Sequence, residues 1–332
     1  MKNITIAVFC LLLLNACRKD NSKFDGPSIQ DLYSNFKLID NFKCDKDSVS
    51  FAAGEVSHFT ASFNKAVKWQ ISITGTTSKA QKIITGQSKT IDANNGTWNG
   101  STTVFPIFGV ENCIAKLTVE GVTDSFLLPI KIRSTKVNNG LVIADFENGF
   151  NSAWTKFAQS GANMDFNVKA DSYAPQGAKY LNMAGTVNWD WCIGYIDFPA
   201  TAYSASNTLA LATNPDAVFF NCLIYGVPNT NSSLVLFQFK EDENADGIFN
   251  AANEDEYDYQ IDVNWSGWKL VTIKYSDVTS MVNGQPVTPK GNSQHNPNKI
   301  GKISMYHLAN KDNGFASCKI DYLIFTSSPI EP

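Results

Sequence analysis

Short runs of alternating apolar and polar residues, separated by turn residues at intervals of roughly ten positions, dominate this sequence. In one such run Phe59, Ala61 and Phe63 alternate with polar neighbours, and turn signals follow at Gly75 and Gly86. A period of two places successive side chains on opposite faces of a strand. No run keeps a sustained helical period, and only 17% of the residues are charged. The sequence therefore predicts an all-β protein and excludes coiled coils and helical bundles.

The composition narrows the kinds of molecule that the protein could bind. The 332 residues are enough for two domains of ordinary size, and 12% of them are aromatic. The net charge of −4 provides no basic footprint, so nucleic acid is excluded as a partner. An acidic, aromatic chain rich in uncharged polar residues is typical of extracytoplasmic β-sandwich proteins.

The N-terminus carries a targeting signal. A short basic start precedes an apolar stretch over residues 4–14, which is too short to span a bilayer but fits a secretory signal. Its end, Leu14-Asn15-Ala16-Cys17, resembles a bacterial lipobox, with Asn15 as a mild departure. The resemblance implies that residues 1–16 are removed, that Cys17 is acylated and that polar residues 17–35 form a tether. An ordinary signal peptide or a short membrane anchor is the alternative.

Residues 36–134 form the first expected domain. About seven short strands and Trp69, early in the third, resemble an immunoglobulin-like β-sandwich. We expect Trp69 in the core, and we expect Trp98, in a turn between Gly96 and Gly100, to be exposed. The polar stretch 134–140 is the expected domain boundary.

Residues 141–327 form the second expected domain. Its strand-like runs resemble the galactose-binding-like β-jelly-roll of carbohydrate-binding modules. The residues that carry the resemblance are the opening Asp145-Phe146-Glu147-Asn148-Gly149, the strand Gly177-Ala178-Lys179-Tyr180-Leu181, Trp268 before an apolar strand, and the terminal Ile320-Asp321-Tyr322-Leu323. The resemblance implies a sugar-binding sandwich.

The whole layout resembles the surface glycan-binding lipoproteins of Bacteroidetes polysaccharide-utilisation systems. The resemblance implies a lipid-anchored protein of the outer membrane, displayed at the cell surface, that captures a polysaccharide or oligosaccharide beside an outer-membrane transporter complex. Export signals of that group are usually acidic after the cysteine, whereas this chain has Arg18-Lys19-Asp20. A periplasmic orientation therefore stays open.

The sharpest local motif is an acidic loop over residues 242–254. Asp242, Asn244 and Asp246, followed by a glycine, place oxygen side chains at alternate positions around a tight turn, as calcium loops do. Further expected ligands are the Ile248 carbonyl, Asn250 and Glu254. Because strand-like runs flank the loop, we expect a calcium-braced strand connection. A solvated turn without metal is the alternative.

A second calcium site is implied only by the jelly-roll resemblance, in which a structural ion lies near the first and last strands. Its expected ligands are Asp145 and Glu147, on one face of the first strand, and Asp321 in the last strand. An ordinary charge pair at the strand ends is the alternative.

Sugar binding requires flat apolar rings together with planar polar groups. The densest such cluster is the run that contains Trp189 and Trp191, and Tyr195 continues it along one strand. Neighbouring strands are expected to add Asn221 and Gln238, and Tyr225 and Lys240 are expected as scaffold. Trp154 and Trp265 are alternates, and core packing is the competing interpretation for each tryptophan.

Signatures of catalysis are sparse. None of the nucleophile-elbow, zinc-protease or phosphate-loop motifs is present, and a lone strand histidine such as His307 is usually structural. The sequence predicts a non-catalytic binding protein. An adhesion or protein-interaction module, or a glycoside hydrolase or lyase on the same scaffold, are the alternatives. The cysteines at strand positions are expected as buried free thiols, with a Cys44–Cys113 disulfide as the alternative.

Overall fold

The computed structural model describes residues 35–172, 174–187, 191–227, 233–309 and 314–331. The lipobox with Cys17, most of the tether, and Trp189 lie outside the described residues. As expected, the described chain is all-β, with strands joined by turns and single-turn 3-10 helices. Within the described residues, no helix is long and apolar enough to cross a membrane.

The N-terminal unit is built around one long strand, β3 (Ser57–Gly75), which pairs along its length with several partners. The sheet runs β1 (Leu38–Cys44), β3, β6 (Asn112–Val119), β7 (Ser125–Ser134) and β2 (Ser48–Ser50), with β4 (Gln81–Ile91) and β5 (Thr97–Trp98) also paired to β3. Alternate β3 side chains enter the core, as the period of two predicts. The immunoglobulin-like topology of this unit stays a prediction.

For the two tryptophans of this unit, one expectation is confirmed and the other is wrong. Trp69 is buried in the core, as expected. The expectation that Trp98 is exposed is wrong, because Trp98 lies in β5, whose pairing with β3 places the indole in the core, where it is completely buried. Trp98 makes edge-on contacts with Phe51 and Phe108, at centroid distances of 4.8 and 5.0 Å, and its Nε1 donates to the Ser101 carbonyl at 2.9 Å.

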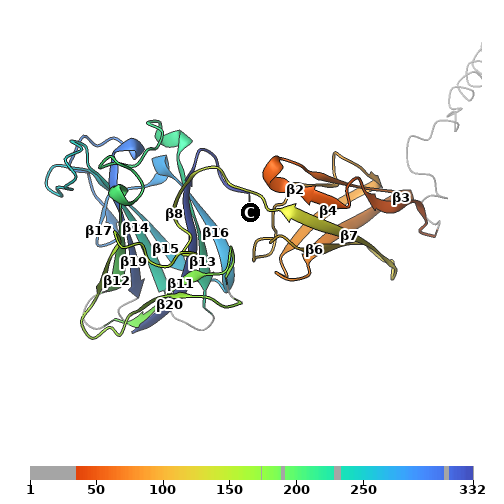
Figure 1. Ribbon diagram of the computed structural model, residues 1–332, viewed down its shortest axis with the longest axis horizontal. Helices are drawn as coiled ribbons and strands as arrows, with labels where there is room; N and C mark the ends of the chain where they lie inside the picture. The colour runs from red at the N-terminus through yellow and green to blue at the C-terminus, as the bar shows by residue number, and fades with distance from the viewer. Residues whose placement is uncertain (1–34, 173, 188–190, 228–232, 310–313, 332) are drawn as a thin grey trace, which may run out of the picture.

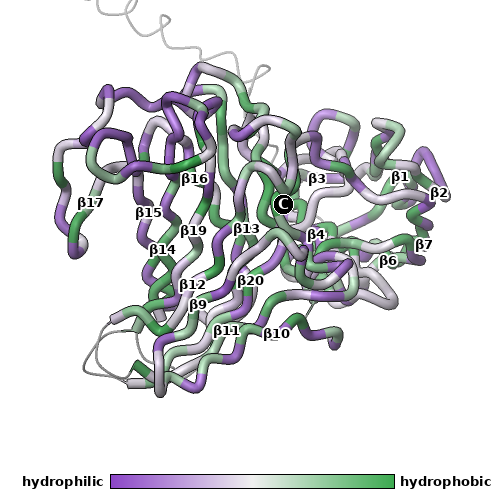
Figure 2. Tube along the Cα trace, turned by 60° about the vertical axis from the view of Figure 1, so that its left-hand side comes forward, coloured by the Kyte–Doolittle hydropathy of each residue, from purple (hydrophilic) through white to green (hydrophobic). Residues whose placement is uncertain are grey.

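The C-terminal unit is a sandwich of two antiparallel sheets (Figure 1). The β13 sheet runs β10 (Asp165–Lys169), β11 (Tyr180–Thr186), β20 (Phe315–Thr326), β13 (Phe219–Gly226) and β16 (Gly267–Lys274), with β8 (Leu141–Ala144) also on β20. The β14 sheet runs β15 (Glu256–Val263), β14 (Ser233–Glu241), β19 (Ile300–Ala309), β12 (Cys192–Pro199) and β9 (Thr155–Ala158). A small hairpin, β17 (Met281–Val282) and β18 (Gln285–Pro286), lies beyond β16 in the chain. Hydrophilic segments gather in the loops near β17 (Figure 2).

The core of the sandwich lies between these sheets, because each strand turns its apolar side chains inward. In β14 the side chains of Val235, Phe237 and Phe239 are fully buried, whereas the alternate Gln238 and Lys240 are only half-buried. Burying one apolar face of each sheet provides most of the stabilising free energy of such a fold. The outward face of the β14 sheet is therefore free to carry polar and aromatic groups.

Three cysteines, Cys113, Cys222 and Cys318, are buried as expected, whereas Cys44 and Cys192 are only partly buried. The five cysteines in the described residues, Cys44 and Cys113 included, are free thiols. His307 is fully buried, its Nδ1 lies 3.6 Å from the Cys318 sulfur, and burial lowers its pKa to about 4. A neutral histidine inside the core offers no base to a substrate on the surface.

Candidate functional site

The outer face of the β14 sheet carries two rows of side chains that cross the strands. Antiparallel pairing places Tyr195 opposite Tyr306 and Asp197 opposite Ser304. The first row, here called the aromatic row, consists of Phe157, Tyr195 and Tyr306 on β9, β12 and β19. The second, the polar row, consists of Asp197, Ser304, Gln238 and Asp258 on β12, β19, β14 and β15. Together they lie on one face that five strands supply, with Ser304 and Asp258 buried and the other members at least partly exposed.

The aromatic row is a continuous strip of three rings. The Phe157 and Tyr195 rings are stacked, with centroids 5.0 Å apart and an interplanar angle of 22°. The Tyr195 and Tyr306 centroids lie 4.7 Å apart at 40°. Phe157 is 41% exposed, so the strip is open to solvent at its β9 end. Contacts between these neighbouring cross-strand rings stabilise the arrangement of the strip.

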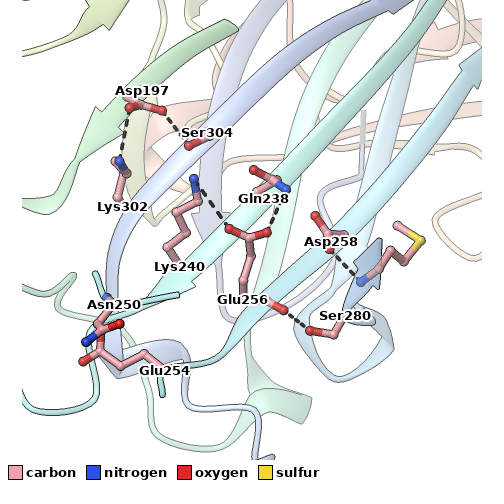
Figure 3. Close-up of polar contacts among 11 residues, drawn as sticks. Asp197, Gln238, Lys240, Asn250, Glu254, Glu256, Asp258, Ser280, Lys302 and Ser304 are labelled. Atoms are coloured by element: carbon pink, nitrogen blue, oxygen red, sulfur yellow. Dashed lines mark hydrogen bonds and ion pairs between the residues drawn. The ribbon is translucent and has the colours of Figure 1, made fainter. Parts of the chain in front are cut away.

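The polar groups beside the strip are held by ion pairs and hydrogen bonds (Figure 3). Asp197 accepts from Lys302 Nζ at 3.2 Å and from Ser304 Oγ at 2.5 Å. Lys240 Nζ lies 3.5 Å from Glu256 Oε2. Fixed side chains lose little conformational freedom when a ligand binds, which favours affinity.

Glu256 also accepts from the Gln238 amide at 2.9 Å, so one carboxylate joins an amide and an ammonium group of β14. The Ser280 hydroxyl donates to the Glu256 carbonyl oxygen, which fastens the segment before β17 to the edge strand β15. This edge borders the polar row.

Asp258 closes the polar row under that segment. Its Oδ2 accepts from the Met281 N–H at 2.8 Å, whereas its buried Oδ1 has no partner among the described residues. Burial raises the pKa of Asp258 to about 6, and the Met281 N–H opposes the shift. The carboxyl therefore titrates in mildly acidic solution.

Two of the residues expected to bind sugar, Tyr195 and Gln238, lie on this outer face. Asn221 and Tyr225 do not, because the neighbour of β12 is β19, and β13 belongs to the other sheet. Asn221 is fully buried, and its amide is bonded to Thr326 and Thr272 at 2.9 Å each. The strand order of a jelly roll brings distant segments together, which local alternation cannot reveal.

The three described tryptophans that were expected near the sugar site differ in exposure: one is open to solvent and two pack against the core. Trp191 is 48% exposed just before β12, and a bulge between Cys192 and Gly194 turns Ile193 into the core instead of keeping it on the same face as Tyr195. Trp154 packs edge-on against Phe146, Phe150 and Phe198, so its ring belongs to the core, and Trp265 also packs against the core.

Sequence reasoning missed four residues of the outer face: Phe157, Asp258, Ser304 and Tyr306. The signal for two of them was present, since Lys302, Ser304 and Tyr306 alternate with apolar residues along one strand. Phe157 lies on the short edge strand β9, whose side chains are all exposed and which offers no alternation to read.

The acidic loop connects β14 and β15, as expected for a strand connection. Asp242 accepts from the N–H groups of Asp246 and Gly247 at 3.1 and 2.7 Å, and Asn244 and Asp246 are bonded to each other. Gly247 has a φ of 87°, which permits the tight turn.

The remaining expected ligands line the second half of this loop. Glu254 Oε2 accepts from the Asn250 N–H at 2.6 Å, while its Oε1 is buried without a partner among the described residues. The Ile248 N–H donates to Asp246 at 2.8 Å. The donor set is all oxygen, which suits a hard cation, but Asp242, Asp246 and Glu254 are not among the described acids whose carboxylate oxygens lie within 4.8 Å of one another, so calcium in this loop stays a prediction.

The three acids expected at the second site also lie near one another. Asp321 is fully buried in β20, and burial, with the negative charges of Glu147 and Asp145 adding to it, raises its pKa to about 9. Asp145 and Glu147 follow the end of β8, in a turn, and are not on the strand itself as expected. Asp321 Oδ2 and Gln176 Oε1 are both buried and lack partners among the described residues. Among the described acids, only Glu241, Glu243 and Asp255 bring three carboxylate oxygens within 4.8 Å of one another, so a calcium ion at Asp145, Glu147 and Asp321 stays a prediction.

No protein-family model matches the chain, and no curated protein does. Among solved structures it is similar to a family 11 carbohydrate-binding module from Clostridium thermocellum, at 17% identity and a TM-score of 0.38, over 59% of this chain and 99% of that one. A xylan-binding domain from Paenibacillus barcinonensis matches at 15% identity and a TM-score of 0.32, over 58% and 99%. A cleaved adhesin domain of Lys-gingipain from Porphyromonas gingivalis matches at 16% identity and a TM-score of 0.31, over 57% and 100%.

Proposed function

We propose that the outer face of the β14 sheet binds a polysaccharide or oligosaccharide without transforming it. The observation that carries this proposal is the aromatic row of Phe157, Tyr195 and Tyr306, which lies beside the partly exposed Asp197 carboxylate and Gln238 amide. Aromatic faces pack against the CH-rich faces of pyranose rings, and planar polar groups bind sugar hydroxyls.

The size of the surface suits a glycan chain rather than a single sugar. Three adjacent strands contribute the aromatic row, and strands lie about 4.8 Å apart, so the row extends for about 10 Å across the sheet. This length accommodates neighbouring sugar rings, with the glycan chain crossing the strands. The exposed Phe157 at the β9 end allows the chain to continue past the sheet edge.

The charges of the face favour an uncharged glycan. Lys302 is paired with Asp197, and Lys240 is paired with Glu256, so both ammonium groups are already engaged. Asp258 adds a further acid at the edge. A polyanionic glycan would need unpaired cations, because like charges across an interface oppose binding.

The proposal is tested by electrophoresis of the protein through gels that contain soluble neutral or acidic polysaccharides. We expect at least one neutral polysaccharide to retard the parent protein, and Tyr195→Ala to abolish the retardation. Tyr225→Ala, on the β13 sheet, is the matched control and should behave as the parent. Equal retardation of all three proteins would contradict the proposed face, and new reducing ends in the bound polysaccharide would contradict a non-catalytic role.

We also propose that lipid at Cys17 anchors the protein in the outer membrane, at the cell surface, where a transporter in the same membrane is the expected partner for uptake. The lipobox supports this proposal, since lipoprotein acylation supplies the several chains that stable anchoring needs. Cys17→Ser should move the protein from the membrane to the soluble fraction. A variant that stays with the membrane would contradict the anchor.

We propose calcium as the structural cofactor at two places, the loop of Asp242, Asn244, Asp246 and Glu254, and the group of Asp145, Glu147 and Asp321. Oxygen-only donor sets and buried carboxylate oxygens without partners support this proposal. An ion that binds only the folded chain stabilises it against unfolding.

A further inference from the structure

A second group of acids lies at the base of the β14–β15 connection. Its members are the sequence neighbours of Asp242 and Glu254, two of the expected ligands in the acidic loop. Glu241, Glu243 and Asp255 each place one carboxylate oxygen within 4.8 Å of the other two. Glu241 and Asp255 are fully buried, and Glu243 is partly exposed. Three carboxylates this close repel one another unless protons or a cation neutralise them.

Glu241 has an oxygen without a partner. Its Oε1 accepts from the Tyr275 hydroxyl at 2.8 Å and from the Asn296 N–H at 2.7 Å. Its Oε2 is buried and has no hydrogen-bond partner among the described residues. A buried polar atom without a partner costs about 1–3 kcal/mol, and more for a charged group, so it indicates a missing ligand.

The segment over residues 291–296 wraps the group with backbone N–H donors. Asp255 accepts from Gly291 at 2.6 Å and from Ser293 at 2.7 Å, and Glu243 accepts from Asn292 at 3.1 Å. A Cβ atom on Gly291 would lie 2.3 Å from Glu243 Oε2, so the glycine leaves room for this carboxylate in its present position.

The backbone N–H groups of this segment carry only partial positive charges. In the described chain, no lysine, arginine or histidine forms an ion pair with any of the three carboxylates. A buried acidic group without a counter-charge is costly, and metal coordination is one of the few ways to keep it.

We propose that Glu241, Glu243 and Asp255 bind a calcium ion of their own, distinct from an ion in the Asp242 loop. Carboxylate oxygens are ligands for hard cations. Oxygens on opposite sides of a calcium ion, each at ~2.4 Å, are about 4.8 Å apart, so three oxygens within that distance of one another fit a single coordination sphere.

The ion would act on the proposed glycan-binding face from behind, by holding the end of the strands that carry it. Glu241 follows Lys240 in the chain, and Asp255 precedes Glu256, so the ion would lie on the buried side of the strand ends whose outer side carries the Lys240–Glu256 pair. It would join the end of β14, the start of β15 and the segment over residues 291–296. This role does not depend on which ligand the face binds.

The experiment counts calcium ions on the full chain by native mass spectrometry, and measures melting temperature in calcium and in chelator. We expect Glu243→Gln to bind one ion fewer than the parent and to lose part of the calcium-dependent rise in melting temperature. Asp262→Asn, an exposed acid of β15, is the control for loss of one charge and should match the parent. Melting in chelator shows that each variant is folded.

The double variant Asp246→Asn with Glu243→Gln separates this site from the loop site, and should bind two ions fewer than the parent. The proposal is overturned if Glu243→Gln keeps the parent's count, because protons and the N–H donors would then suffice. It is also overturned if the double variant loses only one ion, because the two groups would then share it.

Discussion

Asp258 gives the sharpest prediction of how stability depends on pH. The carboxyl is buried beneath the segment that precedes β17, and burial raises its pKa from the ordinary value of 3.8 to about 6. An acid whose pKa is higher in the folded chain binds protons more tightly there, so it favours the folded state at low pH. Its stabilising contribution is complete below about pH 4 and is lost as the pH rises to about 6.

A shift of about two pKa units corresponds to roughly 3 kcal/mol, at ~1.4 kcal/mol per unit. The perturbation is Asp258→Asn, which removes the titrating group and keeps the shape of the side chain. The free energy of unfolding of the variant, relative to the parent, should therefore increase by about 3 kcal/mol between pH 4 and pH 7. Other groups titrate in both proteins alike and cancel in the difference.

The assay is urea denaturation of both proteins across that pH range, followed by fluorescence. Asp262→Asn, an exposed acid of the same strand, controls for the loss of one negative charge. A difference between Asp258→Asn and parent that stays constant from pH 4 to pH 7 would refute the reasoning. It would mean that Asp258 is hydrated or paired in the folded chain.

Two further predictions concern the core and the metal. Trp98→Ala should lower the free energy of unfolding of the N-terminal unit by about 3–5 kcal/mol, as measured by denaturation, because the buried indole packs against Phe51 and Phe108; a change below ~1 kcal/mol would contradict its place in the core. Calcium at a hundred times its Kd should stabilise the parent by ~2.7 kcal/mol for each occupied site, roughly 5–10 °C in melting temperature, and Asp321→Asn should lose the gain of one site; an unchanged gain would show that Asp321 binds no ion.

The strands could be predicted from the sequence because alternation is a local property. The pattern along Val235 to Lys240 fixes which side chains point inward, and the structure agrees. The connection between β14 and β15, which contains Asp242, could also be predicted, because turn residues and acids interrupt two alternating runs there.

The partners of each strand could not be predicted in this way. A period of two says that Tyr195 and Asn221 each lie on one of two faces, but not that β19 lies between β12 and β14. The face therefore includes Tyr306 and excludes Asn221, which is buried in the other sheet. Trp98 and Trp154 were misplaced for a related reason, because long-range pairing decides which rings reach the core: β5 carries Trp98 against β3, and the Trp154 ring packs on Phe198 of β12.

The central claim, that the aromatic row of the β14 sheet binds glycan, is tested most directly by isothermal titration of the full chain with the polysaccharide that retards it most. Tyr306→Ala should weaken binding by about 2 kcal/mol, or roughly thirtyfold in Kd, since truncating a stacking aromatic at the centre of a site has this effect. Tyr225→Ala, on the opposite sheet, should leave Kd unchanged. An unchanged Kd in Tyr306→Ala, or an equal loss in both variants, would contradict the claim.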